Sequence, residues 1–115
     1  MPSTTAYKRW DVVLVPFPYT DFTATKRRPA LIISPDNYNF GPDLAIAFVT
    51  SQMNSPSRIG DYHLKQWQAA GLPKPSMVRM KFVTVDKAIV IKKLGRLREE
   101  DRVEIAKALL SFFAS

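Results

Sequence analysis

Apolar residues recur along this chain in short runs separated by turn-forming residues, a pattern typical of a small β protein. The clearest run is 11–17 (DVVLVPF), which is rich in valine and closes with a proline-containing stretch. Residues 29–34 (PALIIS), 44–50 (LAIAFVT) and 88–92 (AIVIK) are further runs of strand length. Each of the four is therefore predicted to form a β-strand.

A fifth strand is predicted from a different pattern. Residues 76–85 alternate, so that Met77, Arg79, Lys81 and Val83 should lie on one side of the strand and the intervening residues on the other. This arrangement predicts a half-buried strand with a basic face.

One long helix is expected at the end of the chain, over 98–115, and its first turn carries three acidic residues that suit the positive end of a helix dipole. The earlier segment 61–72 is ambiguous and could form either a short edge strand or one helical turn. Apolar residues recur through the long helix at helical spacing. The stripe expected to pack on the sheet consists of Val103, Ala106, Leu109, Leu110 and Phe113.

These elements predict a mainly β (α+β) fold. About five antiparallel strands should form a small, strongly bent sheet that closes into a barrel, with the C-terminal helix packed on it. The length of 115 residues fits one domain, 1–115, in which residues 1–9 are expected to be a flexible N-terminal segment.

Composition limits the classes of function. No run approaches the roughly 18 apolar residues of a membrane span, and the first residues lack the apolar core of a signal peptide, which predicts a cytoplasmic protein without membrane contact. The chain has no cysteine, so disulfides and thiolate metal sites are excluded. Seventeen Lys and Arg against ten Asp and Glu give a net charge of +7, which favours a polyanionic or acidic partner.

Three cations, Lys26, Arg27 and Arg28, stand immediately before Pro29 at the start of a predicted buried strand. Pro29 restricts the backbone after Arg28, and the apolar run anchors it, so the guanidinium could be aimed at a ligand. RNA cleavage through the substrate's own 2′-hydroxyl needs such a cation beside the phosphate that gains charge. The alternative is that Arg28 forms an ion pair with a carboxylate near a dimer surface.

Several strings of this sequence occur in the order found in a known protein family. They are DVVLVPFPYTD, KRRPALIIS, LAIAFVTSQ, AGLPKPSMVR and KKLGRL before a helix. Together they resemble the MazF/PemK family of toxin endoribonucleases over nearly the whole chain. The resemblance implies an SH3-like barrel, a homodimer, and cleavage of single-stranded mRNA to 2′,3′-cyclic phosphate and 5′-hydroxyl ends. It further implies that no metal or other cofactor is needed and that an acidic, partly disordered antitoxin blocks the enzyme.

The resemblance also implies catalytic residues. Arg28 matches the family's arginine before proline, Thr50 matches its catalytic threonine, and Arg79 falls where some members carry a catalytic arginine. Those members have an acid two positions later, whereas this chain has Lys81. From the sequence alone, without the family resemblance, a Thr-Ser-Gln sequence after a strand usually indicates only a turn.

The general base is not assigned from the sequence. Relatives place a glutamate or histidine at positions that match Phe22 and Thr23; Asp21 is the nearest acid and is equally suited to a turn. His63 is the only histidine, and a lone histidine is more often structural or solvated than catalytic. Residues expected to contact RNA are Asp21, Lys26, Arg27, Ser51, Gln52, Arg58 and Lys81.

Two tryptophans leave alternatives open. Trp10 and Trp67 could either pack against the sheet or stack on unpaired RNA bases. Two other functions are also compatible with the sequence. A gyrase-poisoning toxin of the same fold would act without cutting RNA, and a non-catalytic RNA-binding module would bind RNA without turnover.

Overall fold

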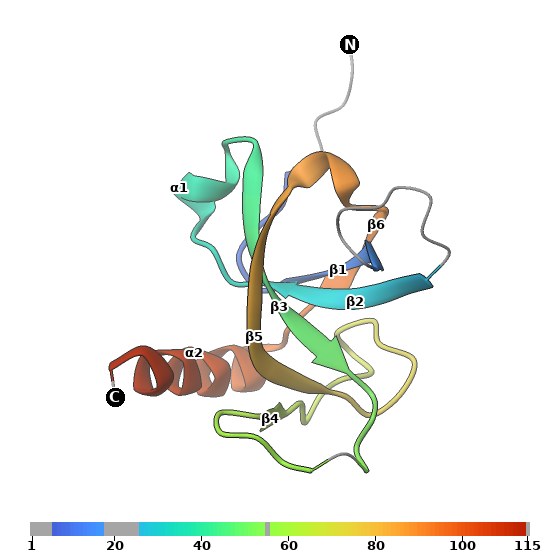
Figure 1. Cartoon of the computed structure of the whole chain (residues 1–115), viewed down its shortest axis with the longest axis vertical. Helices are drawn as coiled ribbons and strands as arrows, with labels where there is room; N and C mark the ends of the chain where they lie inside the picture. The colour runs from blue at the N-terminus through green and yellow to red at the C-terminus, as the bar shows by residue number, and fades with distance from the viewer. Residues whose placement is uncertain (1–5, 18–25, 55, 115) are drawn as a thin grey trace.

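The strands form a single curved antiparallel sheet, in a computed structural model that describes residues 6–17, 26–54 and 56–114 (Figure 1). The strand order is β4-β5-β3-β2-β1-β6. The helix α2 lies across one side of the curved sheet (Figure 1). The elements are β1 (Asp11–Phe17), β2 (Lys26–Ile32), α1 (Asp36–Asn39), β3 (Asp43–Thr50), β4 (Tyr62–His63), β5 (Met77–Asp86), the 3₁₀ turn η1 (Lys87–Ile89), β6 (Lys92–Arg96) and α2 (Glu99–Ala114).

Both faces of the sheet are covered, which explains the nearly continuous apolar sequence of β1. Val12 belongs to a core cluster that includes Ile105 and Leu109 of α2. Val13 and Val15 belong to a second cluster on the other face, together with Ile89 of η1. The predicted fold class, a mainly β barrel-like sheet with a C-terminal helix, is thus confirmed. Within the described residues no helix is long and apolar enough to cross a membrane.

Two predicted strand boundaries were wrong. The strand predicted at 29–34 begins earlier, at Lys26, because Lys26 to Pro29 pair with β1. In the strand predicted at 88–92, residues 88–89 belong to the turn η1, residues 90–91 belong to no element, and only Lys92 belongs to a strand. The turn η1 starts where the Asp86 side chain accepts a hydrogen bond from the backbone N–H of Ala88. The last strand is β6, whose exposed lysines pair with β1.

The regular alternation predicted for β5 is interrupted. Ala47 of β3 pairs with Phe82, but the next residue, Phe48, pairs with Arg79, so β5 has two more residues than β3 at this point. Such an irregularity bends a strand and changes which side chains share a face. Met77 and Val78, which precede the irregularity, are consecutive and both buried.

The buried face of α2 also differs from the predicted stripe. Ile105, Leu109 and the acidic residue Asp101 are buried, whereas Val103, Leu110 and Phe113 are 46%, 72% and 65% exposed. The reason is that the helix is rotated so that Asp101 faces β4 and the residues that follow it.

Asp101 holds the segment between β3 and β5 whose secondary structure the sequence left ambiguous. Its carboxylate accepts hydrogen bonds from the Tyr62 hydroxyl (2.6 Å) and from the backbone N–H groups of Lys65 (3.0 Å) and Gln66 (2.9 Å). Tyr62 and His63 form the short edge strand β4, which is one of the two alternatives expected from the sequence. Of the N-terminal segment expected to be flexible, residues 1–5 lie outside the described residues, while the backbone of Arg9 donates to Asp36.

Two glycines let the chain after β4 approach β6 closely. Gly71 has a φ of 87°, and a Cβ there would overlap the carbonyl of Leu94; a Cβ at Gly95 would overlap the carbonyl of Ala70. This approach holds the loop of residues 71–76 beside β6 and β1.

We expect Gly71→Ala to lower the free energy of unfolding by about 1–3 kcal/mol, because the variant combines an unfavourable positive φ with a backbone overlap. Urea unfolding followed by circular dichroism measures this change. Gly41→Ala is the matched control, since Gly41 does not have a positive φ, and it should cost less. Equal stability of Gly71→Ala and the parent would contradict the assigned geometry.

Candidate functional site

Arg28 and Thr50 lie just beyond the paired part of β2 and β3 and line the same two pockets. The last ladder pair between these strands is Ala30 with Phe48, and Arg28 and Thr50 each lie two residues beyond it. The strands separate at this point, because the ladder covers only Ala30 to Ile32. Two side chains that lie 22 positions apart in the sequence therefore share the open end of the β2–β3 pair.

Two pockets meet at this pair of residues. The smaller, of about 160 Å³, has an aromatic wall, and the larger, of about 490 Å³, has a cationic one. Both are lined by Arg28, Pro29, Val49 and Thr50. The smaller pocket is completed by Phe17, Phe48 and Gln52. The larger is completed by Leu14, Arg27, Ser51, Gly71, Leu72, Pro73, Lys74, Ser76, Lys92 and Leu94.

Arg28 lies within β2 and is exposed, whereas the sequence placed it immediately before the strand. Its guanidinium carbon is 5.7 Å from the centroid of the Phe17 ring, a distance at which a cation is attracted to an aromatic face. Across the described parts of the chain no carboxylate lies within ion-pair distance of Arg28. The guanidinium therefore has donors that can bind a phosphate.

Thr50 is half-buried, and its hydroxyl oxygen accepts a hydrogen bond from the backbone N–H of Gln52 (3.1 Å). The expected turn is thus present, and the hydroxyl can still donate its own proton. Ser51 and Gln52 are exposed beside it and line the larger and the smaller pocket respectively.

Arg79 does not line either pocket, and it is paired with Phe48 of the aromatic wall across the β3–β5 ladder. It forms a two-point ion pair with Asp61, with Nε to Oδ1 at 3.1 Å and one terminal nitrogen to Oδ2 at 2.9 Å. The side chains are 11% and 2% exposed. Asp61 is a site-adjacent residue that the sequence interpretation missed, because it lies 18 positions from its partner.

The ion pair changes the titration of both groups. The hydrogen bond from Arg79 is the main cause that lowers the pKa of Asp61 below its ordinary value of 3.8, and the backbone N–H of Arg58 (2.8 Å) contributes in the same direction. The bond to Asp61 likewise raises the pKa of Arg79. Arg58 thus contributes its backbone here, while its side chain is exposed.

We expect Asp61→Asn to lower the free energy of unfolding at neutral pH, and we expect variant and parent to be equally stable in acid. Because the folded-state pKa is lowered, the carboxylate stabilises the fold above its ordinary pKa, and the contribution is lost as the pH falls through the lowered value. Urea midpoints of variant and parent should differ at neutral pH and converge below the lowered pKa. The control is Glu104→Gln, which removes an exposed contact of 3.7 Å to Lys107 and should change little. A pH-independent difference would contradict the assignment.

The aromatic wall carries a cation over each ring. Phe17 and Phe48 are in edge-to-face contact, with centroids 6.1 Å apart. The Lys81 ammonium lies 4.8 Å from the Phe48 centroid, and Arg28 lies over Phe17. The exposed Lys26 pairs with Phe17 in the β1–β2 ladder. Arg28, Lys81 and Lys26 are therefore gathered at one end of the sheet, as an anionic ligand requires.

Several other residues considered from the sequence are not part of this site as the structure describes it. Asp21 lies outside the described residues. His63 is exposed on β4 and does not line either pocket. Trp10 and Trp67 both pack against the core cluster beneath α2, which favours the packing interpretation for each.

Sequence reasoning missed the two lysines of the larger pocket, Lys74 and Lys92. Lys74 lies between two prolines in the string AGLPKPS, and its isolation there could have singled it out. The described lining of the two pockets contains no aspartate, glutamate or histidine. Across the described residues there is also no cluster of three or more histidine, cysteine, aspartate or glutamate residues that could hold a metal ion.

Comparison with known proteins identifies the family. Residues 8–113 match the family model for the PemK-like, MazF-like toxin of type II toxin–antitoxin systems. A search of curated proteins returned no match. Among solved structures, a mycobacterial endoribonuclease in complex with its cognate antitoxin has a TM-score of 0.74 at 18% identity, covering 96% of each chain. MazF from Deinococcus radiodurans has a TM-score of 0.72 at 20% identity, covering 97% of this chain and all of that one. Both likenesses establish the fold, and the family match over 8–113 establishes that this chain belongs to the PemK-like, MazF-like toxins of type II toxin–antitoxin systems.

Proposed function

We propose that this toxin is a metal-independent endoribonuclease that cleaves single-stranded mRNA at selected sequences. The observation that carries the proposal is that Arg28 and Thr50 both line the aromatic pocket and the cationic pocket, which meet at these two residues. A phosphodiester at this junction would have a guanidinium beside its oxygens, a hydroxyl within the same site, and room for the nucleotides on either side.

The proposed reaction uses the substrate's own nucleophile. The 2′-oxygen forms a bond to phosphorus while the bond from phosphorus to the 5′-oxygen breaks. The 2′-hydroxyl loses its proton to a base, and the 5′-oxygen gains one from an acid. The products are a 2′,3′-cyclic phosphate and a 5′-hydroxyl. Arg28 would stabilise the charge that develops on the phosphoryl oxygens, and Thr50 would orient the phosphate or the attacking 2′-oxygen.

The cations around the junction would bind the RNA backbone. Arg27, Lys74 and Lys92 line the larger pocket, and Lys26, Arg58 and Lys81 extend the positive surface. Ser51 and Gln52 are placed to contact the nucleotides next to the cleaved bond. Arg79, which the family resemblance gives as catalytic, is bound to Asp61 and lines neither pocket, so in this proposal it supports the strand beside Phe48.

Partners and location complete the proposal. The protein acts in the cytoplasm as a homodimer, and a cognate antitoxin with an acidic, partly disordered segment inhibits it. Support for the antitoxin comes from the family match and from the net charge of +7. The mycobacterial endoribonuclease that was solved in complex with its cognate antitoxin has the same fold.

The test is digestion of a long RNA by the purified protein in the presence of EDTA, with the product ends sequenced. We expect cleavage at a recurring short motif, with cyclic-phosphate ends. A matched oligonucleotide with a 2′-deoxy sugar at the cleaved position should remain intact, because it lacks the nucleophile. Binding of RNA without cleavage would indicate the non-catalytic module instead, and cleavage of the 2′-deoxy oligonucleotide would contradict the mechanism.

A further inference from the structure

The larger pocket lies on one face of the sheet. In an antiparallel ladder the side chains of paired residues point to the same face, and successive residues along a strand point to opposite faces. Leu14 of β1 pairs with Pro29 of β2 and with Lys92 of β6, so these three side chains share a face. All three line the larger pocket, and so does Arg27, which lies two positions before Pro29.

The smaller pocket lies on the opposite face. Arg28 is two positions before Ala30, and Ala30 pairs with Phe48, so the side chains of Arg28 and Phe48 share this second face. Phe17 lies three positions after the Leu14 of the first face and points to the second as well. Arg28, Phe48 and Phe17 all line the smaller pocket. The two pockets therefore meet around the open end of the β2–β3 pair.

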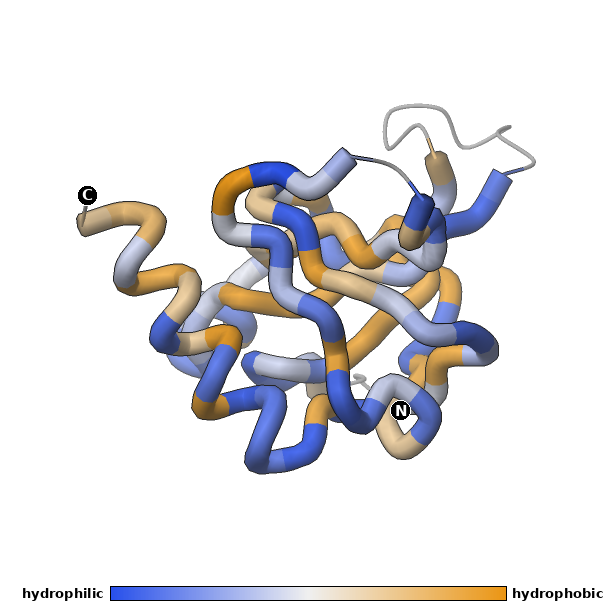
Figure 2. Tube along the Cα trace, turned by 90° about the horizontal axis from the view of Figure 1, so that it is seen from below, coloured by the Kyte–Doolittle hydropathy of each residue, from blue (hydrophilic) through white to orange (hydrophobic). Residues whose placement is uncertain are grey.

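These positions suit the geometry of the proposed cleavage. In phosphoryl transfer the attacking and leaving oxygens lie roughly in line, on opposite sides of phosphorus. A phosphate between Arg28 and Thr50 would direct one of these two oxygens toward each pocket. It would lie where β2 changes from exposed cations to buried apolar residues, a change that the colouring of the tube shows in Figure 2. A side chain that protonates the leaving 5′-oxygen must therefore line one of the two pockets.

Lys74 reaches this junction from the side opposite to Arg28. In the sheet, β3 has β5 on one side and β2 on the other. Thr50 of β3 pairs with Met77, the first residue of β5, and Lys74 lies three residues before Met77. The Ser76 hydroxyl donates to the carbonyl of Lys74 (2.8 Å), which ties this residue to the start of β5. Three adjacent strands therefore bring Arg28, Thr50 and Lys74 to the larger pocket, which all three line.

The backbone of Lys74 is restricted on both sides. Pro73 precedes it and Pro75 follows it. Proline fixes its own φ and favours an extended conformation for the residue before it. The close approach of Gly71 to β6 holds the same loop against the sheet. Among the described residues the Lys74 ammonium forms no ion pair with a carboxylate, so its protons are available to a substrate.

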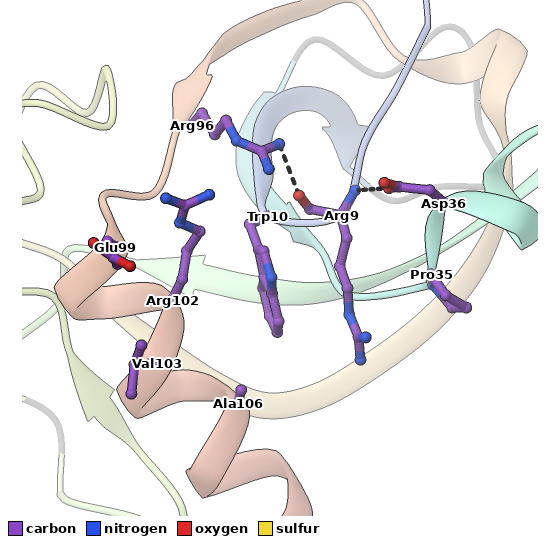
Figure 3. Close-up of a pocket in the computed structure, with 9 residues that line it drawn as sticks. All are labelled: Arg9, Trp10, Pro35, Asp36, Arg96, Glu99, Arg102, Val103 and Ala106. Carbon is purple, nitrogen blue, oxygen red and sulfur yellow. Dashed lines mark hydrogen bonds between the residues drawn. The ribbon is translucent and has the colours of Figure 1, made fainter.

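The larger pocket differs in charge from the other cavity that is rich in cations. That cavity, of about 560 Å³, lies beside Trp10 and contains three arginines together with Asp36 and Glu99 (Figure 3). It adjoins an open groove of about 370 Å³, which part of the apolar stripe of α2 lines. The described lining of the larger pocket contains no carboxylate, so a substrate phosphate is the anion that would balance its cations.

The chemistry of the remaining side chains narrows the choice of a proton donor. The described lining of both pockets contains no aspartate, glutamate or histidine. A guanidinium holds its protons too tightly to act as an acid, and a hydroxyl is no stronger an acid than the 5′-hydroxyl that must form. An ammonium group is a stronger acid than either. Lys92 is the other lysine of the larger pocket, but its strand β6 is separated from β3 by two strands.

We propose that Lys74 is the general acid of the cleavage reaction. As the bond from phosphorus to the 5′-oxygen breaks, its electron pair stays on the oxygen, which takes a proton from the Lys74 ammonium. The neutral amine that results regains a proton from water. The nucleotide that leaves with the 5′-hydroxyl then occupies the larger pocket. The inference rests on the proposed function and deepens it, because it assigns the proton donor of that reaction.

The test compares an ordinary oligonucleotide with one in which sulfur replaces the 5′-oxygen of the cleaved bond. A thiolate leaves without a proton, so the sulfur substrate does not need the acid. Single-turnover rates are measured for both and corrected for cleavage without protein. Lys74→Met should cleave the ordinary substrate about 10²-fold or more slowly than the parent, and the sulfur substrate at a rate close to that of the parent. Because Lys74 is exposed, circular dichroism should show an unchanged fold.

Three further variants separate proton donation from phosphate binding. Lys74→Arg keeps the positive charge but holds its protons more tightly, so it should also be slow with the ordinary substrate and restored by sulfur. Lys92→Met removes a cation from the same pocket and should slow both substrates by the same factor. Lys107→Gln removes an exposed cation of α2 that lines neither pocket, and it should equal the parent with both substrates.

Several results would overturn the assignment. Equal slowing of the two substrates in Lys74→Met would indicate that Lys74 only binds the RNA backbone. Cleavage of the ordinary substrate by Lys74→Arg at the rate of the parent would lead to the same conclusion. Restoration of Arg28→Ala by sulfur, without restoration of Lys74→Met, would assign the acid to Arg28. If the parent cleaves neither substrate, the proposed function fails together with this inference, whereas each of the other results refutes the role of Lys74 alone.

Discussion

Replacing Arg28 with alanine is expected to lower the rate of RNA cleavage by more than about 10²-fold, the scale of removing one preorganised donor to a transition-state charge. The guanidinium is exposed at the end of β2 and, among the described residues, is not used in an ion pair, so the fold does not depend on it. Single-turnover cleavage of a defined oligonucleotide measures the loss. Circular dichroism and urea unfolding should show an unchanged protein.

Arg27→Ala is the matched control for this experiment. Arg27 neighbours Arg28 in the exposed first part of β2 and lines only the larger pocket. Its loss should weaken RNA binding and reduce the dependence of binding on salt, with a smaller effect on the rate of the cleavage step. Cleavage by Arg28→Ala at a rate near that of the parent would exclude Arg28 as the group that stabilises the transition state.

An acidic protein encoded by the neighbouring reading frame is expected to abolish RNA cleavage, with inhibition that saturates at a fixed ratio to the toxin dimer. Its flexible segment should cover the positive surface formed by Arg28, Lys74 and Lys92 and exclude the substrate. Ordering a disordered segment costs entropy, so apolar contacts must add to the ionic attraction. Titration of cleavage against this protein, and rescue of growth on co-expression, measure the effect.

The dependence of inhibition on salt concentration distinguishes the ionic contribution to binding from the apolar one. Ionic attraction at the surface is screened, whereas burial of apolar side chains is not, so the complex should weaken at high salt without disappearing. Complete loss of inhibition at moderate salt would indicate a purely ionic complex. If no neighbouring acidic protein inhibits the toxin and the purified toxin does not arrest growth, the antitoxin proposal fails, even where RNA cleavage itself is observed.

Local patterns predicted the central strands well. The run 11–17 has the same bounds as β1, and the run 44–50 differs from β3 by one residue. Both strands are buried on one or both faces, so their sequences carry the apolar pattern that burial requires. Strands with exposed faces were harder to predict from the sequence. The sequence of β6 is KKLGR, and its lysines do not indicate a strand. This segment is a strand because it pairs with β1.

The residue types of the candidate site and their order along the chain were sufficient to indicate the family, a cationic surface and the pair Arg28 and Thr50. Only the tertiary structure decided that β2 and β3 pair as far as Ala30 and Phe48 and no further, and that Arg28 and Thr50 beyond this pair line the same two pockets. It also decided that Asp61 neutralises Arg79 and that the apolar stripe of α2 lines an open groove. The physical reason is that local sequence reports propensity and burial, whereas strand register, loop closure and helix rotation result from contacts between residues distant in the chain.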